Sequence, residues 1–574
     1  MLRPEHPNPS KKHLSFINLN GTWEFEFDNT LVGIEKKYYE REHLDGKIEV
    51  PFCPESKLSG IGNTDFINAV WYRRDIEIPE GALNGNVLIT FGAVDYEAKV
   101  YINGVLAAEH TGGYTPFTVN ATKLLKSGKN SLCVYAKDNI RNWIPRGKQS
   151  SRLQSHGCDY TRTTGIWQTV YMEFLPESYI KNVKLTPDAE NCSVSADIEI
   201  AGGGDVVFEA FYEGRSVGSF AKKTAGGIVS MDIPLSESHL WEVGNGRLYD
   251  VRVTLGGDTF ETYFGLRSIR LEDKKFLINN KSVFQRLVLD QGFYEDGIYT
   301  APTAEDIEKD IILSMSLGFN GARPHMKVFE PLYMYYADRH GYITWGEFPS
   351  WDLNFSLDKT FGITAPQWIE AVERDYNHPS IVGWCPLNET SIDCNGAKEA
   401  HDSNVRNMYF LTKALDKTRP CIDTSGYVHQ KYTDIYDMHN YTQSPEQMRA
   451  DYAEFEKGGL PVDERAMHFR RQSFYDGQPL FISEMGGARW LEKDPAVGAS
   501  WGYGNDPKTE DEFFERFEGL CHALMDNKNI FGLCYTQLYD IEQEQNGLLY
   551  YDRTPKFEPA KFKAILDRKA SIEN

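Results

Sequence analysis

The sequence lacks long apolar runs. Nowhere do about eighteen consecutive apolar residues appear, which is the length that crosses a bilayer as a helix. The start, Met1-Leu2-Arg3-Pro4, also lacks the apolar core of a secretion signal. We therefore expect no membrane partner and, as the default, a cytoplasmic location.

Cysteine and positive charge are also in short supply. The nine cysteines show no Cys-x-x-Cys spacing, and Cys385, Cys421 and Cys534 lie inside apolar runs, so we expect reduced core thiols and no metal site. Lys and Arg number 61 against 83 Asp and Glu, which gives a formal charge of -22. Because a protein needs a basic face to bind phosphate backbones, we expect no nucleic-acid partner. The His-Glu-x-x-His pair of zinc proteases is absent as well.

Alternating apolar and polar residues fill the first part of the chain. The segments 22–27 and 99–104 alternate, and Asn103-Gly104 is typical of a hairpin turn. We predict a β-sandwich over residues 1–175. A second β-rich stretch over 176–271 has about the length of an immunoglobulin-like sandwich.

After residue 272 short apolar runs alternate with helical stretches, which indicates parallel β/α architecture. Eight runs qualify as strands, the number that closes a TIM barrel over 272–574. A helix is predicted over 304–317, where Thr303 and Asp306 suggest a capping box. The eight runs lie near Val283 and at 318–323, 342–347, 381–389, 420–424, 434–439, 480–484 and 530–537.

Two glutamates stand where apolar runs stop, Glu389 after the fourth predicted strand and Glu484 after the seventh. The carboxyl ends of barrel strands converge on one face. Two convergent carboxylates are the apparatus of glycoside hydrolysis, in which one protonates the leaving oxygen and the other attacks the sugar or activates a water. A separation near about 5 Å would indicate a retaining enzyme. Asn388 can bond a sugar 2-hydroxyl.

The run 377–384, Asn-His-Pro-Ser-Ile-Val-Gly-Trp, followed by Asn388-Glu389, resembles the acid/base signature of glycoside hydrolase family 2. This family holds β-galactosidases, β-glucuronidases and β-mannosidases. The run 479–486, Pro-Leu-Phe-Ile-Ser-Glu-Met-Gly, is similar to the nucleophile segment of the family. Other stretches resemble the sugar-binding jelly roll and the second and third barrel strands in the expected order, namely 19–23, 70–74, 164–168, 318–325 and 341–349.

The resemblance implies a retaining O-glycosyl hydrolase that acts on an oligosaccharide or glycoside without a cofactor or metal. Glu389 would be the acid/base, with a raised pKa, and Glu484 the ionised nucleophile. Tyr441, which follows His439, would bond the nucleophile. The resemblance also implies a homo-oligomer, either a dimer or a tetramer.

Further residues are predicted to bind substrate. Arg323 and His325 end the second strand, where they would support the carboxylates or bind sugar hydroxyls. Asp290 either contacts a hydroxyl or caps the following loop. The remaining candidates lie at the end of the sixth strand, near the seventh and eighth strands and in the following loop, namely His439, Trp490, Tyr535, Gln537 and Glu544.

One departure from the family guides the choice of sugar. Family β-glucuronidases grip the sugar carboxylate with an Asn-x-Lys pair, but this chain reads Gln543-Glu544-Gln545-Asn546 there. No lysine stands at that position, and Glu544 would repel a uronate. We therefore predict β-galactosidase activity. A β-glucuronidase, β-galacturonidase or β-mannosidase stays open as the alternative, and a non-catalytic carbohydrate-binding protein as a remote one.

Overall fold

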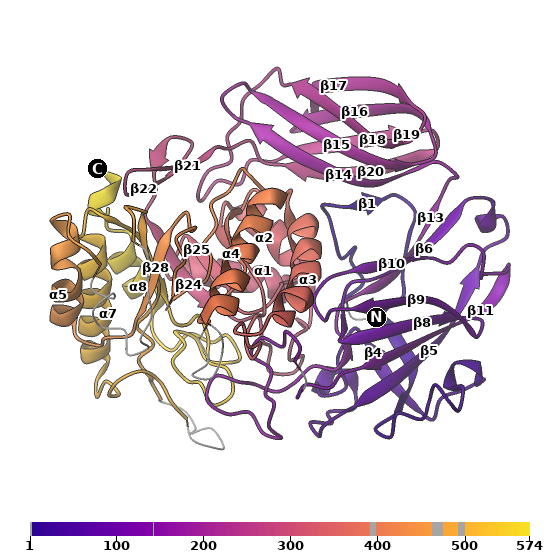
Figure 1. The fold of residues 1–574 in the computed structure, drawn as a ribbon, viewed down its shortest axis with the longest axis horizontal. Coiled ribbons are helices and arrows are strands. Elements are labelled where there is room, and N and C mark those ends of the chain that lie inside the picture. Colours follow the sequence, from indigo (N-terminus) through magenta and orange to yellow (C-terminus); the bar gives the residue numbers. More distant parts are fainter. Residues whose placement is uncertain (1–2, 142, 391–397, 427, 462–474, 492–499) are drawn as a thin grey trace.

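The computed structural model describes residues 3–574 except 142, 391–397, 427, 462–474 and 492–499. Three parts are visible in Figure 1: a β-sandwich near the N-terminus, a second one above it, and a barrel with surrounding helices that ends at the C-terminus. No helix in the described ranges is both long and apolar enough to cross a membrane. The domain limits drawn from the sequence stay a prediction.

Two antiparallel sheets form the first sandwich. Trp23 and Phe25 point into its core from β3, as the alternation of that segment predicts. Asn103 and Gly104 both have positive φ and join β8 to β9, which suits a tight two-residue hairpin. The larger sheet has the order β4 (Gly46–Val50), β3 (Gly21–Phe27), β5 (Ala69–Ile78), β11 (Gly128–Lys137), β8 (Glu97–Ile102) and β9 (Val105–Thr111). The smaller has the order β10 (Phe117–Asn120), β6 (Asn86–Phe91), β13 (Val170–Leu175) and β2 (Phe16–Asn18), and β12 (Gly165–Ile166) pairs with β7 (Val94–Asp95).

The second sandwich is immunoglobulin-like and borrows a strand from the N-terminal segment. Strand β1 (Lys12–His13) pairs with β20 at the edge of a five-stranded sheet. This sheet has the order β1, β20 (Asp258–Phe264), β19 (Tyr249–Leu255), β16 (Gly204–Tyr212) and β17 (Arg215–Thr224). It faces a sheet of β14 (Tyr179–Asp188), β15 (Ser193–Ala201) and β18 (Gly227–Pro234), and a small sheet of β21 (Ile269–Glu272), β22 (Lys275–Ile278) and β23 (Lys281–Ser282) leads to the barrel.

Within the described residues the barrel holds seven parallel strands in one curled sheet, and every residue of these strands except Asn440 is buried. The predicted fifth strand over 420–424 is reduced to isolated bridges, in which Cys421 pairs with Trp384 and Ser425 with Asn388. This segment fills the gap between the sheet's two ends, because Ser425 also donates its hydroxyl to Asp437. The sheet order is β27 (Ile381–Cys385), β26 (Ile343–Glu347), β25 (Gly321–Pro324), β24 (Gln285–Asp290), β30 (Ile530–Tyr535), β29 (Leu480–Met485) and β28 (Tyr436–Asn440).

Helices surround this sheet (Figure 1). The predicted capping box is present at the start of α1, where Thr303 accepts from the Asp306 amide and the Asp306 side chain accepts from that of Thr303. The helices are α1 (Ala304–Ser316), α2 (Pro331–His340), α3 (Lys359–Asp375), α4 (Lys398–Leu415), α5 (Pro445–Glu456), α7 (Glu510–Met525) and α8 (Pro559–Leu566). Short 3-10 turns are η1 (Tyr38–Glu40), η2 (Lys57–Ser59), η3 (Ala82–Asn84) and η4 (Ser571–Glu573).

Candidate active site

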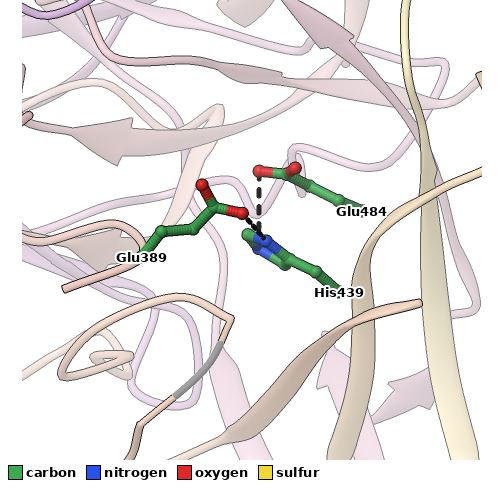
Figure 2. A group of neighbouring side chains, drawn as sticks. All are labelled: Glu389, His439 and Glu484. Atoms are coloured by element: carbon green, nitrogen blue, oxygen red, sulfur yellow. Dashed lines mark hydrogen bonds and ion pairs between the residues drawn. The ribbon is translucent and has the colours of Figure 1, made fainter. Parts of the chain in front are cut away.

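Glu389 and Glu484 meet at the carboxyl end of the barrel strands. Glu484 lies on β29, and Glu389 lies four residues beyond the end of β27 with φ of 47°. Figure 2 shows both carboxylates turned toward each other, with His439 of β28 between them. One carboxylate oxygen of Glu389 and one of Glu484 lie within 4.8 Å of each other. This spacing suits a sugar held between two carboxyl groups about 5 Å apart, rather than a wider gap that would hold a water.

Glu484 is buried and surrounded by donors. The hydroxyl of Tyr441 donates to its Oε2 at 2.5 Å, and Arg323 Nη1 donates to its Oε1 at 3.2 Å. Arg323 also donates to the carbonyl of Ser483, so the guanidinium is fixed beside the carboxylate. Both oxygens of the Glu484 carboxylate therefore have donors, and one of the donors carries a positive charge.

His439 links the two glutamates. Its Nδ1 lies 2.6 Å from Glu389 Oε1, and its Nε2 lies 3.4 Å from Glu484 Oε1 and 3.0 Å from the hydroxyl of Ser425. Burial alone would lower the pKa of His439, but the charges of Glu484 and Glu389 outweigh burial and raise it. A proton on this imidazole is therefore stabilised by both carboxylates.

A second buried carboxylate, Glu347, orients Arg323 and His325. Glu347 accepts from Arg323 Nε at 2.5 Å and lies 3.1 Å from His325 Nδ1. Burial lowers the pKa of His325 well below its ordinary value, so the imidazole is neutral. Of the two roles open to this pair, the contacts favour support of the carboxylates. Sequence reasoning missed Glu347, although it ends the third predicted strand.

Glu389, His439 and Glu484 are also the one group of three potential metal ligands with this spacing within the described ranges. His439 already faces Glu389 through one nitrogen and Ser425 through the other. A metal ion there would engage both carboxylates and displace these hydrogen bonds.

Asn388 contributes an amide to the same face. Its Oδ1 accepts from Arg323 Nη2 at 3.3 Å, while its buried Nδ2 has no hydrogen-bond partner in the described part of the chain. A buried donor without a partner is costly in a protein unless a ligand satisfies it. The amide is therefore available to a bound hydroxyl.

Several other residues predicted to bind substrate are instead engaged in contacts within the protein. Asp290 accepts from the Gly292 amide and from the Tyr539 hydroxyl, so it caps the loop, which was the second of its two predicted roles. Tyr535 packs against Gly486, where an added Cβ would meet its ring at 2.2 Å. Trp490 is partly buried and packs on Phe557 at the edge of the hydrophobic core, with ring centroids 5.0 Å apart.

Gln537 and Glu544 belong to a buried polar network. Gln537 accepts from Gln291 at 2.6 Å and donates to Asn546 at 2.9 Å, and Asn546 donates to Glu544. The hydroxyl of Tyr160, from the first sandwich, donates to Glu544 at 2.5 Å. The N-terminal part of the chain therefore reaches the barrel mouth.

The same N-terminal loop carries a residue that sequence reasoning missed. Lys148 is 6% exposed, and its charge is close enough to Glu544, Glu389 and Glu484 for these carboxylates to act on its pKa. No local motif marks this lysine, because it lies far from the glutamates in sequence.

A TIM barrel with two facing carboxylates at its mouth is the architecture of a glycoside hydrolase. The comparisons with known proteins agree. Three models of Glycosyl hydrolases family 2 match the chain in succession: the sugar binding domain over residues 60–176, the family's central domain over 178–267 and the TIM barrel domain over 269–460. The chain belongs to this family and is a glycosyl hydrolase.

Curated relatives span nearly the whole chain. A β-glucuronidase of Streptococcus agalactiae is 24% identical over 598 residues, with 95% of each chain covered. A β-glucuronidase of Sus scrofa is 25% identical and covers 82% of this chain and 77% of its own. Among solved structures, the β-glucuronidase of Ruminococcus gnavus superposes with a TM-score of 0.80 at 18% identity and 99% coverage of both chains, which shows the shared fold.

These relatives overturn the predicted β-galactosidase activity, which was wrong. The proteins that cover most of the chain are named β-glucuronidases, one of the alternatives left open. The prediction relied on the missing Asn-x-Lys pair and on the charge of Glu544. It took no account of cationic side chains from other parts of the chain.

Proposed function

We propose that the protein is a retaining β-glucuronidase that releases a terminal β-linked glucuronic acid from its glycosides. The facing carboxylates of Glu389 and Glu484, with oxygens within 4.8 Å, carry the proposal for the mechanism. The names of the relatives support the sugar.

In the proposed first step, Glu484 attacks the anomeric carbon and forms a glycosyl ester. The bond from that carbon to the leaving oxygen breaks, and Glu389 gives this oxygen its proton. In the second step Glu389 takes a proton from water, the water oxygen bonds the anomeric carbon, and Glu484 leaves as a carboxylate. Each step balances without a cofactor.

The surroundings support this division of roles. Glu484 accepts from Tyr441 and Arg323, which stabilise a carboxylate that must be ionised to attack. Glu389 is more exposed, with 14% of its side chain accessible against 6% for Glu484, so solvent reaches it in the second step. Asn388 Nδ2 is the proposed donor to the sugar 2-hydroxyl, a contact that strengthens in the transition state.

Hydrolysis of a panel of p-nitrophenyl glycosides tests the proposal. The panel holds the β-glucuronide, β-galacturonide, β-galactoside, β-glucoside and β-mannoside, with Glu484→Gln as the control. We expect the wild type to cleave the β-glucuronide fastest and the variant to lose about 10⁴-fold or more in kcat. Preferential cleavage of a neutral glycoside would overturn the assignment of glucuronic acid as the terminal sugar. Activity that survives in the variant would overturn the mechanism.

A further inference from the structure

Lys148 lies on a loop between β11 and β12 that is pressed against the barrel. The Gly147 amide donates to the carbonyl of Pro349, and the Tyr160 amide donates to that of Lys148. A Cβ at Gly147, where φ is 56°, would meet the carbonyl oxygen of Met326 at 2.2 Å. The main chain at Lys148 therefore has a fixed position at the barrel mouth.

Among the residues that the structure describes, the ammonium group of Lys148 makes no hydrogen bond and no ion pair. Its Nζ lies over the ring of Trp351, 3.6 Å from the centroid. Its neighbour Arg146, in contrast, pairs with Asp352 and lies 3.7 Å from Asp159. A cation–π contact satisfies one face of an ammonium and leaves other donors open.

Burial opposes the charge on Lys148, but the surrounding negative groups raise its pKa above the ordinary value. The side chain is therefore protonated in the range where the enzyme works. A buried charge without a hydrogen-bonded partner is expensive. An anionic ligand group would remove this cost.

Glu544 does not fill that role. Tyr160 donates to its Oε2 and Asn546 to its Oε1, and burial raises its pKa. Both carboxylate oxygens are therefore engaged with neutral donors. The repulsion between Glu544 and a uronate is correspondingly reduced.

We propose that Lys148 binds the carboxylate of the terminal uronic acid, and that it supplies the positive charge that the barrel loop with Gln545 lacks. The inference rests on the proposed function, because it names the residue that reads the C6 carboxylate in the same site. It makes the N-terminal sandwich a determinant of sugar specificity. Trp351 would hold the lysine in place and exclude water from the contact.

The experiment compares p-nitrophenyl β-glucuronide with p-nitrophenyl β-glucoside, which differ only in carboxylate against hydroxymethyl at C6. In Lys148→Met we expect the ratio of kcat/KM for the two substrates to fall about 100-fold, as for loss of a buried charged partner. Lys148→Arg keeps a cation and should retain more of the ratio. Lys123→Met, which removes an exposed lysine of the same sandwich, should leave the ratio unchanged.

A second readout is binding of free D-glucuronate and D-glucose to the Glu484→Gln protein by calorimetry, with and without Lys148→Met. Glucuronate alone should lose affinity, about 10-fold or more. If Lys148→Met does not fold, as judged by its melting temperature, Lys148→Gln takes its place in both measurements.

The outcomes separate the two proposals. A wild type that cleaves no uronide overturns the proposed function together with this inference. If the wild type cleaves the glucuronide, two results overturn the inference alone. In one, Lys148→Met changes the ratio of kcat/KM for the two substrates by less than about 3-fold. In the other, kcat/KM falls equally for both substrates.

Discussion

At the scale of single residues, the hydrogen bond from Tyr441 to Glu484 has a measurable consequence. The hydroxyl donates to Oε2 at 2.5 Å, Glu484 is buried, and Tyr441 is half-buried. We expect Tyr441→Phe to lower kcat for the β-glucuronide about 100-fold, because a preorganised donor to a reacting carboxylate is lost. Tyr432→Phe, at an exposed tyrosine, should change kcat little. Steady-state kinetics with melting temperatures checks this, and an unchanged kcat in Tyr441→Phe would remove Tyr441 from the mechanism.

The assignment of Glu389 as the acid/base gives a second prediction. In Glu389→Ala the glycosyl ester on Glu484 can still form from a substrate with a good leaving group, but no base activates water. Azide needs no base, so we expect it to restore turnover at least about 10-fold and to yield the β-glycosyl azide. The product is identified by NMR of its anomeric proton. An α-glycosyl azide, or no rescue, contradicts the assignment.

Residue types at strand ends were enough to predict part of the site. Glu389, Glu484, Arg323 and Tyr441 lie at or just beyond the carboxyl ends of barrel strands, and the structure brings them together. Lys148 was not predictable in this way, because a loop of another sandwich carries it and only the packing of the two parts places it at the mouth. Asp290 also ends a barrel strand, but its Oδ1 accepts from the Gly292 amide and from the Tyr539 hydroxyl, so a position at a strand end does not by itself predict a substrate contact.

At the scale of elements, seven of the eight predicted strands form the barrel sheet, since their apolar runs are long enough to be buried on both faces. The fifth fails for a local reason. Pro420 has no amide to donate, and Asp423 turns back to accept from the Gln430 amide and to face His429. These polar contacts replace a regular ladder over 420–424.

The contacts of His429 with Asp423 and Asp437 make the stability of the protein depend on pH. His429 is buried and lies 2.7 Å from Asp423 and 3.2 Å from Asp437. Burial would lower the pKa of His429, but Asp423 and Asp437 raise it well above its ordinary value. The stabilisation is therefore full below about pH 6.5 and is lost as the pH rises through the folded pKa.

We expect His429→Gln to lower the free energy of unfolding by about 3 kcal/mol at pH 6, because the variant leaves buried carboxylates without a cation. The difference from wild type should shrink at pH 9. Chemical denaturation at both values measures it. His340→Gln, which breaks a half-exposed contact with Glu308, should cost about 1 kcal/mol or less. If His429→Gln lowers the free energy of unfolding equally at both pH values, the predicted loss of stabilisation with rising pH is wrong.

At the scale of the whole molecule, each of the three parts has its own hydrophobic core, and side chains that cross between the parts join them. Tyr160 and Trp167 of the first sandwich belong to the same buried cluster as the barrel and pack on Phe293 and Tyr299. Asn377 joins the second sandwich to the barrel. Its side chain accepts from the Leu185 amide and donates to the Val183 carbonyl, both in β14. The position of Lys148 thus depends on contacts that span the molecule.

The N-terminal segment makes one of these long-range connections through a buried ion pair. Arg3 Nη2 donates to Glu330 Oε2 at 2.7 Å, and its Nη1 donates to the Ala301 carbonyl at 3.2 Å. The Arg3 side chain is 0% exposed and that of Glu330 8%. Removing Arg3 leaves Glu330 buried and unpaired, which is more costly than removing both charges. Removing Glu330 still leaves Arg3 its ion pair with Glu5 at 2.5 Å.

We therefore expect Arg3→Met to lower the free energy of unfolding by about 3 kcal/mol. Glu330→Gln should cost less, because Glu5 still pairs with Arg3. The double variant should be less damaged than the sum of the two, by about 1 kcal/mol or more, because neither charge is then stranded. Thermal and chemical denaturation of the four proteins gives this coupling directly. Kinetics on the β-glucuronide should change little in the double variant, since the pair lies outside the catalytic groups. Additive losses would show that Arg3 and Glu330 act independently and that the segment before β1 does not fasten the sandwich to the barrel.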